Sequence, residues 1–349
     1  MAPAGSDTPI HILGIGNLGK YVAYSLAKSS PKSVTFIFHR KSLEDEWRAE
    51  GEAVTCITDG SSDSRSGFCV ETLPAESPAP EPIRNLIVTT KAYMTVDALK
   101  PLRHRLNSSS SILFLQNGMG VLEEVQNSLF RNEKDTPAFW SGICSAGVYS
   151  TKTFTFVHAG RGPLLIGPAD NRTLPANPAQ PTFTDDMTQR LLQASTLETT
   201  IVPADVIREA QLKKLVVNAV INPLTAIFRC QNGELVDNPT MFAVAKLVLD
   251  ETAIILRTMM PHLQTSFSDQ TLLDLVVSVA GKTRKNTSSM LQDVNAGRKT
   301  EIDYINGYFI REALRLSVPY TCNQRLAELV TRKESLDADG LLRQLATQT

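Results

Sequence analysis

The chain has 349 residues, with 35 Lys and Arg against 36 Asp and Glu, and a formal net charge of -1. This length is sufficient for two domains with cores of their own, while the balanced charge and the aromatic content of 6% argue against nucleic acid as a partner. No apolar run reaches the length of a membrane span, and residues 1–9 lack the features of a signal or transit peptide, so we expect a cytoplasmic protein without membrane partners. Its five cysteines and five histidines are scattered, and their spacing predicts no metal site.

The first predicted element is a strand over residues 9–13, which runs directly into a G-I-G-N-L-G turn and then into a helical pattern. Strand, glycine turn and helix in this order are the context that a dinucleotide-binding fingerprint requires. One glycine makes the tight turn, one allows the pyrophosphate to approach, and one packs the helix, whose first amides favour an anion. The stretch therefore predicts cofactor contacts at Gly14, Gly16, Asn17, Leu18 and Gly19.

The second predicted strand, residues 33–38, ends at His39, Arg40 and Lys41. At this distance from the fingerprint an NAD enzyme carries an acidic residue for the ribose 2′-hydroxyl, whereas basic residues fit a 2′-phosphate. We therefore expect NADPH or NADP as the cofactor, with Arg40 and Lys41 as its contacts. The alternative is that both are solvated loop charges.

Two further buried strands are expected at residues 85–90 and 111–116, and each ends at a polar residue, Lys91 and Asn117. Ligands collect outside the carboxyl ends of strands in open α/β sheets, so both residues are candidates for cofactor or substrate contact. Lys91 is alternatively a charge at a helix start, and Asn117 part of a plain Asn-Gly turn.

The remainder of the first domain is less informative. Residues 60–82 are rich in Ser, Pro, Gly and Glu and predict a long surface insertion, and residues 170–181 a proline-rich loop. Between them, three segments alternate like strands and are expected to complete the sheet in antiparallel fashion. These segments are residues 139–150, 153–158 and 163–166.

Helical periodicity dominates from residue 204 to the end. We therefore predict an α/β Rossmann-type NADP-binding domain over residues 1–203 and an all-α substrate domain over residues 204–349, with the active site in the cleft between them. The expected helices are residues 204–228, 238–260, 268–283, 288–295, 301–317 and 322–334.

Lys214, Asn218 and Asn222 recur four residues apart within a segment that is otherwise apolar. On a helix they form one polar row, and a lysine in such surroundings costs free energy unless it has a partner. Pro223 cannot donate to the Ala219 carbonyl, so we expect a kink that leaves polar backbone near the row. The alternative is a lysine that reaches solvent beside two structural asparagines.

A second polar stretch lies at residues 286–307. Thr300 is expected to cap the following helix, which places Glu301 in its first turn. A carboxylate there is favoured by the helix dipole, and spacing alone does not separate this role from a catalytic one.

Together these segments resemble the ketopantoate reductase family. The resemblance implies NADPH-dependent reduction of 2-dehydropantoate to (R)-pantoate, on the route to pantothenate and coenzyme A. The insertion at residues 60–82 and the loop at 170–181 depart from the compact bacterial type. The segments that carry the resemblance are residues 14–19, 117–120, 214–227, 232–235, 288–293 and 300–307.

The resemblance also implies residue roles. By position, Lys214 matches the catalytic lysine and Glu301 the essential glutamate, which we also expect to touch the cofactor. Asn218, Asn222 and Ser289 match substrate-binding positions, and Asn117 an asparagine beside the nicotinamide, in reach of the substrate as well.

Hydride addition to a ketone builds charge on its oxygen, so a cation must stabilise that charge and supply a proton. Lys214 fits this role as general acid. Two alternatives remain: an NADP-dependent reductase of another branched 2-keto acid, and a non-catalytic NADP-binding sensor. We expect a monomer or homodimer.

Overall fold

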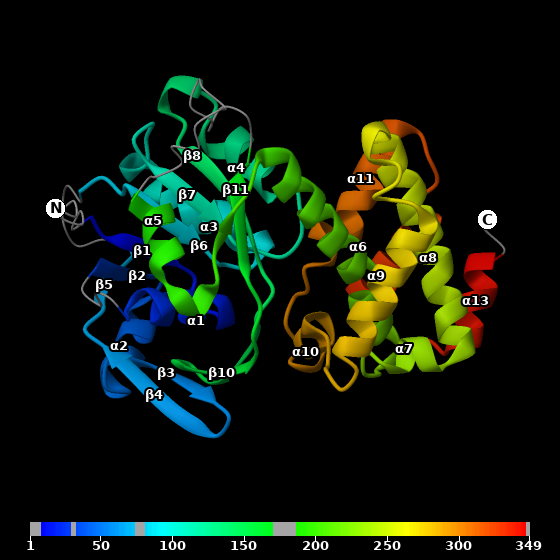
Figure 1. The fold of residues 1–349 in the computed structure, drawn as a ribbon, viewed down its shortest axis with the longest axis horizontal. Coiled ribbons are helices and arrows are strands. Elements are labelled where there is room, and N and C mark those ends of the chain that lie inside the picture. Colours follow the sequence, from blue (N-terminus) through cyan, green and yellow to red (C-terminus); the bar gives the residue numbers. More distant parts are fainter. Residues whose placement is uncertain (1–7, 29–32, 74–80, 170–185, 347–349) are drawn as a thin grey trace. The chain divides into compact units, whose positions relative to one another are not determined.

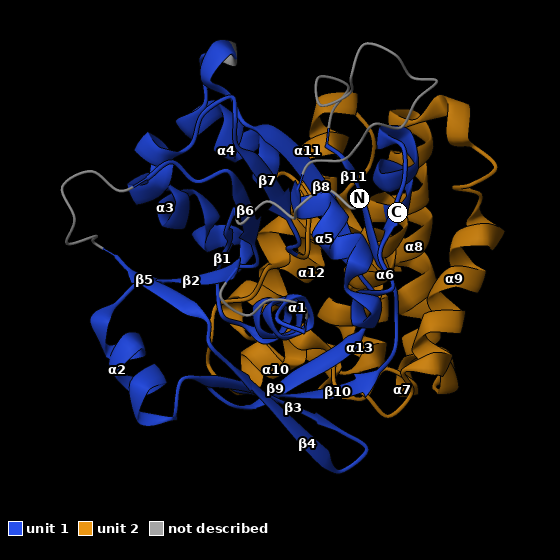
Figure 2. Ribbon diagram, turned by 60° about the vertical axis from the view of Figure 1, so that its left-hand side comes forward, with its two compact units in different colours: residues 1–116, 121–210 blue, residues 117–120, 211–349 orange. Residues whose placement is uncertain are grey.

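The computed structural model describes residues 8–28, 33–73, 81–169 and 186–346. The chain divides into two compact units: unit 1 is residues 1–116 and 121–210, and unit 2 is residues 117–120 and 211–349 (Figure 2). The division falls inside helix α6 (Ala204–Phe228), whereas the sequence indicated a boundary before that helix. One physical reason is that Ile207, near the start of α6, packs closely on Gly167 of unit 1.

Unit 1 is built on an eight-stranded sheet in the order β12-β11-β8-β7-β6-β1-β2-β5 (Figure 1). Neighbouring strands from β5 to β8 run parallel, and β11 is antiparallel to β8. Every residue of β1, β2, β6 and β7 is buried, as in a parallel sheet covered on both faces. The predicted α/β domain is confirmed. The strands are β1 (Ile10–Leu13), β2 (Val34–Phe38), β5 (Cys69–Thr72), β6 (Asn85–Val88), β7 (Ser111–Phe114), β8 (Ala138–Cys144), β11 (Leu164–Pro168) and β12 (Thr200–Ile201).

A second, four-stranded sheet has the order β4-β3-β10-β9. It corrects two predictions. The stretch at 60–82 is not merely a surface insertion, because β4 pairs with β3 and β5 joins the main sheet. The segments at 139–166 do not complete one antiparallel sheet either, because β9 and β10 belong to the second sheet. Its strands are β3 (Ala53–Thr58), β4 (Ser61–Ser66), β9 (Gly147–Lys152) and β10 (Thr155–Gly160). The predicted loop at 170–181 lies outside the described residues.

Helices connect the strands of unit 1. The first follows the glycine turn directly, and its residues from Gly19 to Leu26 are buried. The helices and 3-10 turns are α1 (Asn17–Leu26), α2 (Lys41–Ala49), η2 (Ala92–Met94), α3 (Thr95–Leu99), η3 (Lys100–Arg105), α4 (Val121–Leu129), η4 (Glu133–Asp135), α5 (Asp186–Gln193) and η6 (Ser195–Leu197).

In its described residues unit 2 consists of helices and connecting loops, and α6 contributes much of its apolar core. The predicted helices are present, except that the one expected at 301–317 is divided into a 3-10 turn and α11. None of the helices in the described ranges is long and apolar enough to cross a membrane. The elements after α6 are α7 (Glu234–Asp237), α8 (Pro239–Met259), η7 (Pro261–Leu263), α9 (Asp269–Lys282), α10 (Ser289–Asn295), η8 (Ile302–Tyr304), α11 (Asn306–Leu316), α12 (Thr321–Arg332) and α13 (Ala338–Ala346).

Candidate active site

In the glycine turn after β1, two of the three glycines have no space for a side chain and one does. Gly14 has a φ of +103°, and a Cβ there would lie 2.7 Å from the backbone nitrogen of Thr90. A Cβ on Gly19 would lie 2.0 Å from the Gly14 carbonyl oxygen. By contrast, a Cβ on Gly16 would meet nothing within 4 Å. Gly14 and Gly19 are therefore required by packing, while Gly16 leaves space for a ligand.

The N-terminus of α1 has the properties of an anion site. Its cap residue, Gly16, makes no side-chain cap hydrogen bond, and its first turn contains no acidic residue. The backbone amides at Asn17 and Leu18 begin the helix, where the macrodipole favours a negative group. The residues present therefore fit the pyrophosphate of a dinucleotide.

Lys20 is a functional candidate that sequence reasoning missed. It is 1% exposed. Its Nζ donates to the carbonyl oxygens of Lys152 at 3.2 Å, Thr153 at 3.0 Å and Thr155 at 3.3 Å, and also to the Ser150 hydroxyl. The same hydroxyl donates to Oδ1 of Asn17. Lys20 therefore ties the β9–β10 turn to the glycine turn.

Burial lowers the pKa of Lys20 from 10.5 to about 8, against the opposing charge of Glu50. The signal in the sequence is a lysine within the apolar run that follows Gly19, but nothing there shows where its ammonium lies.

The two basic residues after β2 differ in their neighbours. Lys41 forms ion pairs with Glu44 at 3.0 Å and Asp45 at 3.8 Å, on its own helix α2. Arg40 is exposed, and its guanidinium lies 3.4 Å from Nε2 of His39. Arg40 is therefore the better placed of the two for a 2′-phosphate.

Lys91 follows β6 at the same sheet edge as the glycine turn. The preceding residues contact that turn: Thr89 donates its backbone N–H to Leu13 at 2.9 Å and its hydroxyl to Gly14 at 2.5 Å. Lys91 also begins η2, because its carbonyl accepts from the backbone N–H of Met94 at 2.9 Å. Lys91 therefore lies both outside the carboxyl ends of the strands, where ligands are expected, and at the start of a helical turn.

In unit 2, the row of Lys214, Asn218 and Asn222 lies on one face of α6. Lys214 and Asn218 are half-buried and Asn222 is 7% exposed. The other faces of this part of the helix are packed into the core of unit 2, as the sequence predicted. Within the described part of the chain, the side chains of Asn218 and Asn222 hold no hydrogen bond with protein. Their amides are available to a ligand.

Neighbouring serines at the start of α10 differ in their surroundings. Ser288 is buried, caps the helix by accepting from the Leu291 N–H at 3.1 Å, and has its hydroxyl oxygen 2.7 Å from that of Thr225 on α6. Ser289, the predicted substrate residue, is exposed in the first turn. Ser288 therefore holds α10 against α6 and leaves the Ser289 hydroxyl toward solvent.

The structure also brings the Asn117 turn to the segment that contains Glu301. The backbone N–H of Met119 donates to the Tyr304 carbonyl at 2.8 Å, and a Cβ on Gly118 would lie 2.7 Å from the same oxygen. Glu301 is 6% exposed and precedes η8 without a side-chain cap. The prediction that Glu301 stands in the first turn of the long helix is wrong, because α11 begins only after η8. Glu301 therefore stands at the N-terminus of the short turn η8 rather than of α11.

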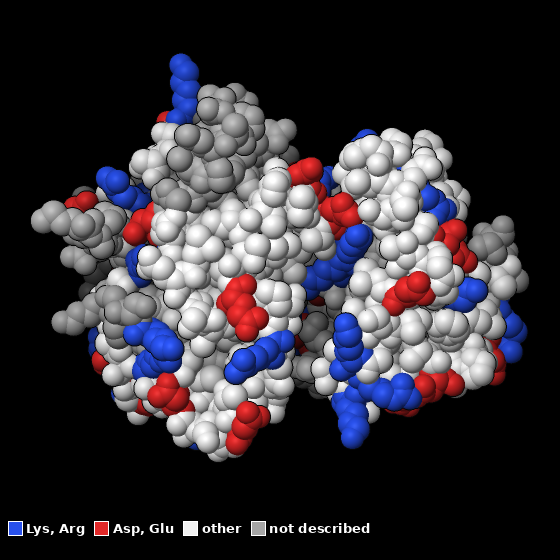
Figure 3. Space-filling view, in the orientation of Figure 1, with Lys and Arg blue, Asp and Glu red and all other residues white. Residues whose placement is uncertain are grey.

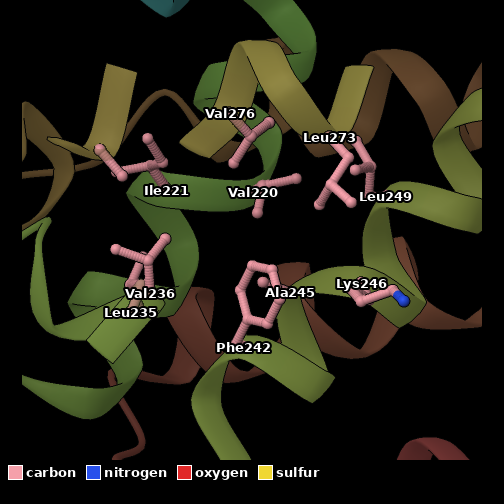
Figure 4. A pocket seen from close by; sticks show the side chains of 11 residues that line it. Val220, Ile221, Leu235, Val236, Phe242, Ala245, Lys246, Leu249, Leu273 and Val276 are labelled. Carbon is pink, nitrogen blue, oxygen red and sulfur yellow. The ribbon is translucent and has the colours of Figure 1, made fainter. Parts of the chain in front are cut away.

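A pocket within unit 2 is lined by none of these candidate residues (Figure 4). It is lined by apolar side chains of α6, α7, α8 and α9, and the Lys246 nitrogen points away from its centre. Apart from Lys246, the lining has no group for proton transfer to a keto acid. On the face in Figure 3, acidic and basic side chains both occur on each unit. In the described ranges, no group of three or more His, Cys, Asp or Glu is arranged to hold a metal.

The predicted site residues thus divide by unit. Unit 1 contains the glycine turn, Arg40, Lys41 and Lys91. Unit 2 contains the proposed catalytic and substrate residues, Asn117, Lys214, Asn218, Asn222, Ser289 and Glu301.

Comparison with known proteins gives matches over most of the chain. Residues 10–171 match a family model described as Ketopantoate reductase PanE/ApbA, and residues 206–334 match Ketopantoate reductase PanE/ApbA C terminal. A probable 2-dehydropantoate 2-reductase of Schizosaccharomyces pombe is 31% identical over 344 residues, which cover 95% of this chain and 98% of that protein.

Two other matches are of similar extent. Ketoisovalerate reductase BEA2 of Gibberella fujikuroi is 30% identical over 391 residues, which cover 97% of this chain and 86% of that protein. The crystal structure of a probable 2-dehydropantoate 2-reductase from Bacillus subtilis has a TM-score of 0.71 and 27% identity, over 93% of this chain and 100% of that one.

Proposed function

The two family matches make this chain a member of the ketopantoate reductase family of oxidoreductases, and from that premise we propose that it reduces 2-dehydropantoate (ketopantoate) to (R)-pantoate with NADPH. The observation that carries the proposal is the polar row on α6. A lysine and two asparagines lie on one face of a helix whose other faces are buried, and both asparagine amides are available. Such a row suits a small acid with a ketone beside its carboxylate.

The residues of unit 1 support a phosphorylated dinucleotide as the reductant. The open space at Gly16 and the uncapped start of α1 suit a pyrophosphate. The exposed Arg40 suits a 2′-phosphate, which distinguishes NADPH from NADH. When bound, NADPH supplies a hydride from C4 of its nicotinamide.

The candidate residues on α6, α10 and beside η8 then have separate chemical tasks. As the ketone carbon accepts the hydride, negative charge gathers on the ketone oxygen, and the ammonium of Lys214 stabilises that charge and transfers a proton to it. The product is an alcohol, and solvent returns the proton to Lys214. Asn218, Asn222 and Ser289 orient the substrate, and Glu301 accepts from its hydroxyl. The proposal requires C4 of the nicotinamide to reach the ketone carbon of the substrate.

Ketoisovalerate is a second candidate substrate, because a ketoisovalerate reductase is 30% identical over 97% of this chain. Ketoisovalerate lacks the terminal hydroxyl of ketopantoate. A site that hydrogen-bonds a hydroxyl rejects the analogue without it by a factor of about 10⁴ or more, whereas an apolar pocket discriminates by about 100-fold or less. We favour ketopantoate because the buried carboxylate of Glu301 is an acceptor for that hydroxyl.

The test is NADPH oxidation with ketopantoate, ketoisovalerate and acetolactate, each repeated with NADH. We expect the highest kcat/KM with ketopantoate and NADPH. A higher value with ketoisovalerate would replace the proposed substrate, and binding of NADPH without turnover of any keto acid would favour the sensor.

Cofactor preference gives a separate prediction at Arg40. Arg40→Glu should raise the KM for NADPH about 10-fold or more through loss of a charge-assisted phosphate contact, and leave the KM for NADH within about twofold. Lys41→Glu is the matched control, since Lys41 is paired with acidic residues on α2. Equal effects on both cofactors would contradict the role of Arg40.

A further inference from the structure

Pro223 lies inside α6 and has no N–H to donate to the carbonyl of Ala219, four residues earlier. In the structure, the Ala219 carbonyl oxygen accepts a hydrogen bond of 2.9 Å from Nδ2 of Asn306. Both residues are fully buried. A side chain from another helix therefore replaces the backbone hydrogen bond that the proline removes.

Asn306 belongs to a longer chain of buried hydrogen bonds. Its Nδ2 also donates to Oδ1 of Asn323 at 2.9 Å, and Nδ2 of Asn323 donates to the Glu251 carboxylate at 2.8 Å. The same carboxylate accepts from the backbone N–H groups of Cys322 and Asn323, each at 2.8 Å, at the start of α12. Segments from α6, α8, α11 and α12 are thereby joined by directional contacts.

This chain of hydrogen bonds connects α6, which carries the polar row, to the segment that follows Glu301. Ala219 lies between Asn218 and Asn222 along α6, so the bond from Asn306 reaches the helix at the turn that these two asparagines span. Asn306 also follows the turn that begins at Glu301, whose carbonyl accepts from the backbone N–H of Ile305 at 3.1 Å. Apolar packing is non-directional, whereas a hydrogen bond fixes both distance and angle.

We propose that Asn306 is a positioning residue: by donating to the carbonyl that Pro223 leaves without a helical donor, it fixes the α6 row of Lys214, Asn218 and Asn222 relative to Glu301. This inference rests on the proposed function, which assigns these residues to the substrate. A keto acid must lie at hydrogen-bond distance from a proton donor and an acceptor together. Misplacement of such groups by about 1 Å costs about 100-fold in rate.

The test is a double-mutant cycle of Asn306→Ala and Pro223→Ala, with kcat and KM measured for the best keto acid of the unmodified protein. Asn306→Ala should lower kcat about 10- to 100-fold. The NADPH Kd should be unchanged, because the glycine turn belongs to the other unit. Pro223→Ala returns an N–H to the Ala219 carbonyl, so Asn306→Ala should lower kcat several-fold less in that background. Equal fold losses in the two backgrounds would overturn the proposal.

Thr252→Val is the matched control for stability. Its hydroxyl oxygen accepts from Nδ2 of Asn323 at 3.2 Å, so it belongs to the same buried network but bonds neither Ala219 nor Pro223. We expect a lower urea midpoint and a kcat within about twofold of the unmodified protein. A loss of kcat as large as that of Asn306→Ala would show a general effect of stability and overturn the proposal.

A second variant keeps the test possible if the first does not fold. If Asn306→Ala does not fold, the cycle is run with Asn306→Ser, whose shorter side chain cannot span the distance to the carbonyl. Inactivity of the unmodified protein on every keto acid would refute the proposed function and this inference together. An active unmodified protein with an unchanged kcat in Asn306→Ala would refute this inference alone.

Discussion

The glycines of the turn after β1 allow packing and ligand binding to be separated at single residues. Gly19→Ala should destabilise the protein by about 2–3 kcal/mol, because its Cβ would overlap a backbone carbonyl. Gly16→Ala should leave the urea midpoint nearly unchanged and weaken NADPH binding about 10-fold or more, because its Cβ occupies the space left for the pyrophosphate. Urea unfolding and NADPH titration of both variants check this. An unaltered NADPH Kd for Gly16→Ala would contradict the assignment.

Lys20 gives a pH dependence with a defined sign. Its pKa is about 8 in the folded protein and ordinarily 10.5, so the unfolded chain binds more protons between these values. The cost of burying the charge is fully present below pH 8 and is relieved as the pH rises to 10.5. The unmodified protein should therefore gain up to about 3 kcal/mol of stability relative to Lys20→Met over this window.

The measurement is urea unfolding of both proteins at intervals across that pH range. Groups such as Tyr21, whose pKa is raised by burial, titrate in both proteins and cancel in the difference. A difference that stays constant with pH would show that the Lys20 ammonium is not desolvated in the folded protein.

For single residues, the sequence predicts a role where a short motif specifies the local backbone. The fingerprint indicated three different roles for Gly14, Gly16 and Gly19, and the space around each glycine agrees with those roles. No such motif specifies the role of Lys20, because its partners lie more than a hundred residues away along the chain. Their identity depends on the pairing of α1 with the second sheet.

Helix α10 offers a pair of adjacent serines for comparison. Ser288→Ala should cost about 1–2 kcal/mol of stability, since it removes the helix cap and the hydroxyl partner of Thr225. Ser289→Ala should change stability by about 0.5 kcal/mol or less because the residue is exposed, and should raise the KM for the keto acid. Steady-state kinetics and urea unfolding distinguish them. A raised KM in Ser288→Ala, together with lower stability in Ser289→Ala, would show that Ser288 rather than Ser289 binds the substrate.

Elements were predicted well where side-chain periodicity decides the structure and poorly where main-chain hydrogen bonds do. The helices after residue 204 bury regular apolar faces, and the sequence indicated most of them. Strand β4 carries polar residues throughout, so its pairing with β3 leaves no signal in hydropathy. The division between η8 and α11 is similar, because no side-chain pattern marks the non-helical backbone of Ile305, which has a φ of -105° and a ψ of -88°.

At the scale of the whole molecule, the chain divides its candidate residues by task. The sheet unit holds the proposed cofactor residues, and the helical unit holds the proposed substrate residues, including the Asn117 turn that precedes α4 in the sequence. Periodicity predicts both kinds of unit. It does not predict that residues 117–120 pack with the helices, because that depends on the contact with Tyr304.

Lys214 is assigned to catalysis by the family motif rather than by its burial. Lys214 is half-buried, so its surroundings alone do not separate a catalytic lysine from one that reaches solvent. The family matches support the motif over both units. Turnover of a variant without the Lys214 ammonium therefore separates these two roles.

The most direct measurement is the turnover of ketopantoate with NADPH by Lys214→Met, beside the matched variant Lys213→Met. Loss of the proton donor should lower kcat about 10²- to 10⁴-fold in Lys214→Met. Its NADPH Kd should stay within about twofold of the unmodified value, because the proposed cofactor residues lie in unit 1. Lys213→Met should retain nearly full turnover. A Lys214→Met protein that turns over ketopantoate at nearly the unmodified rate would contradict the proposed mechanism.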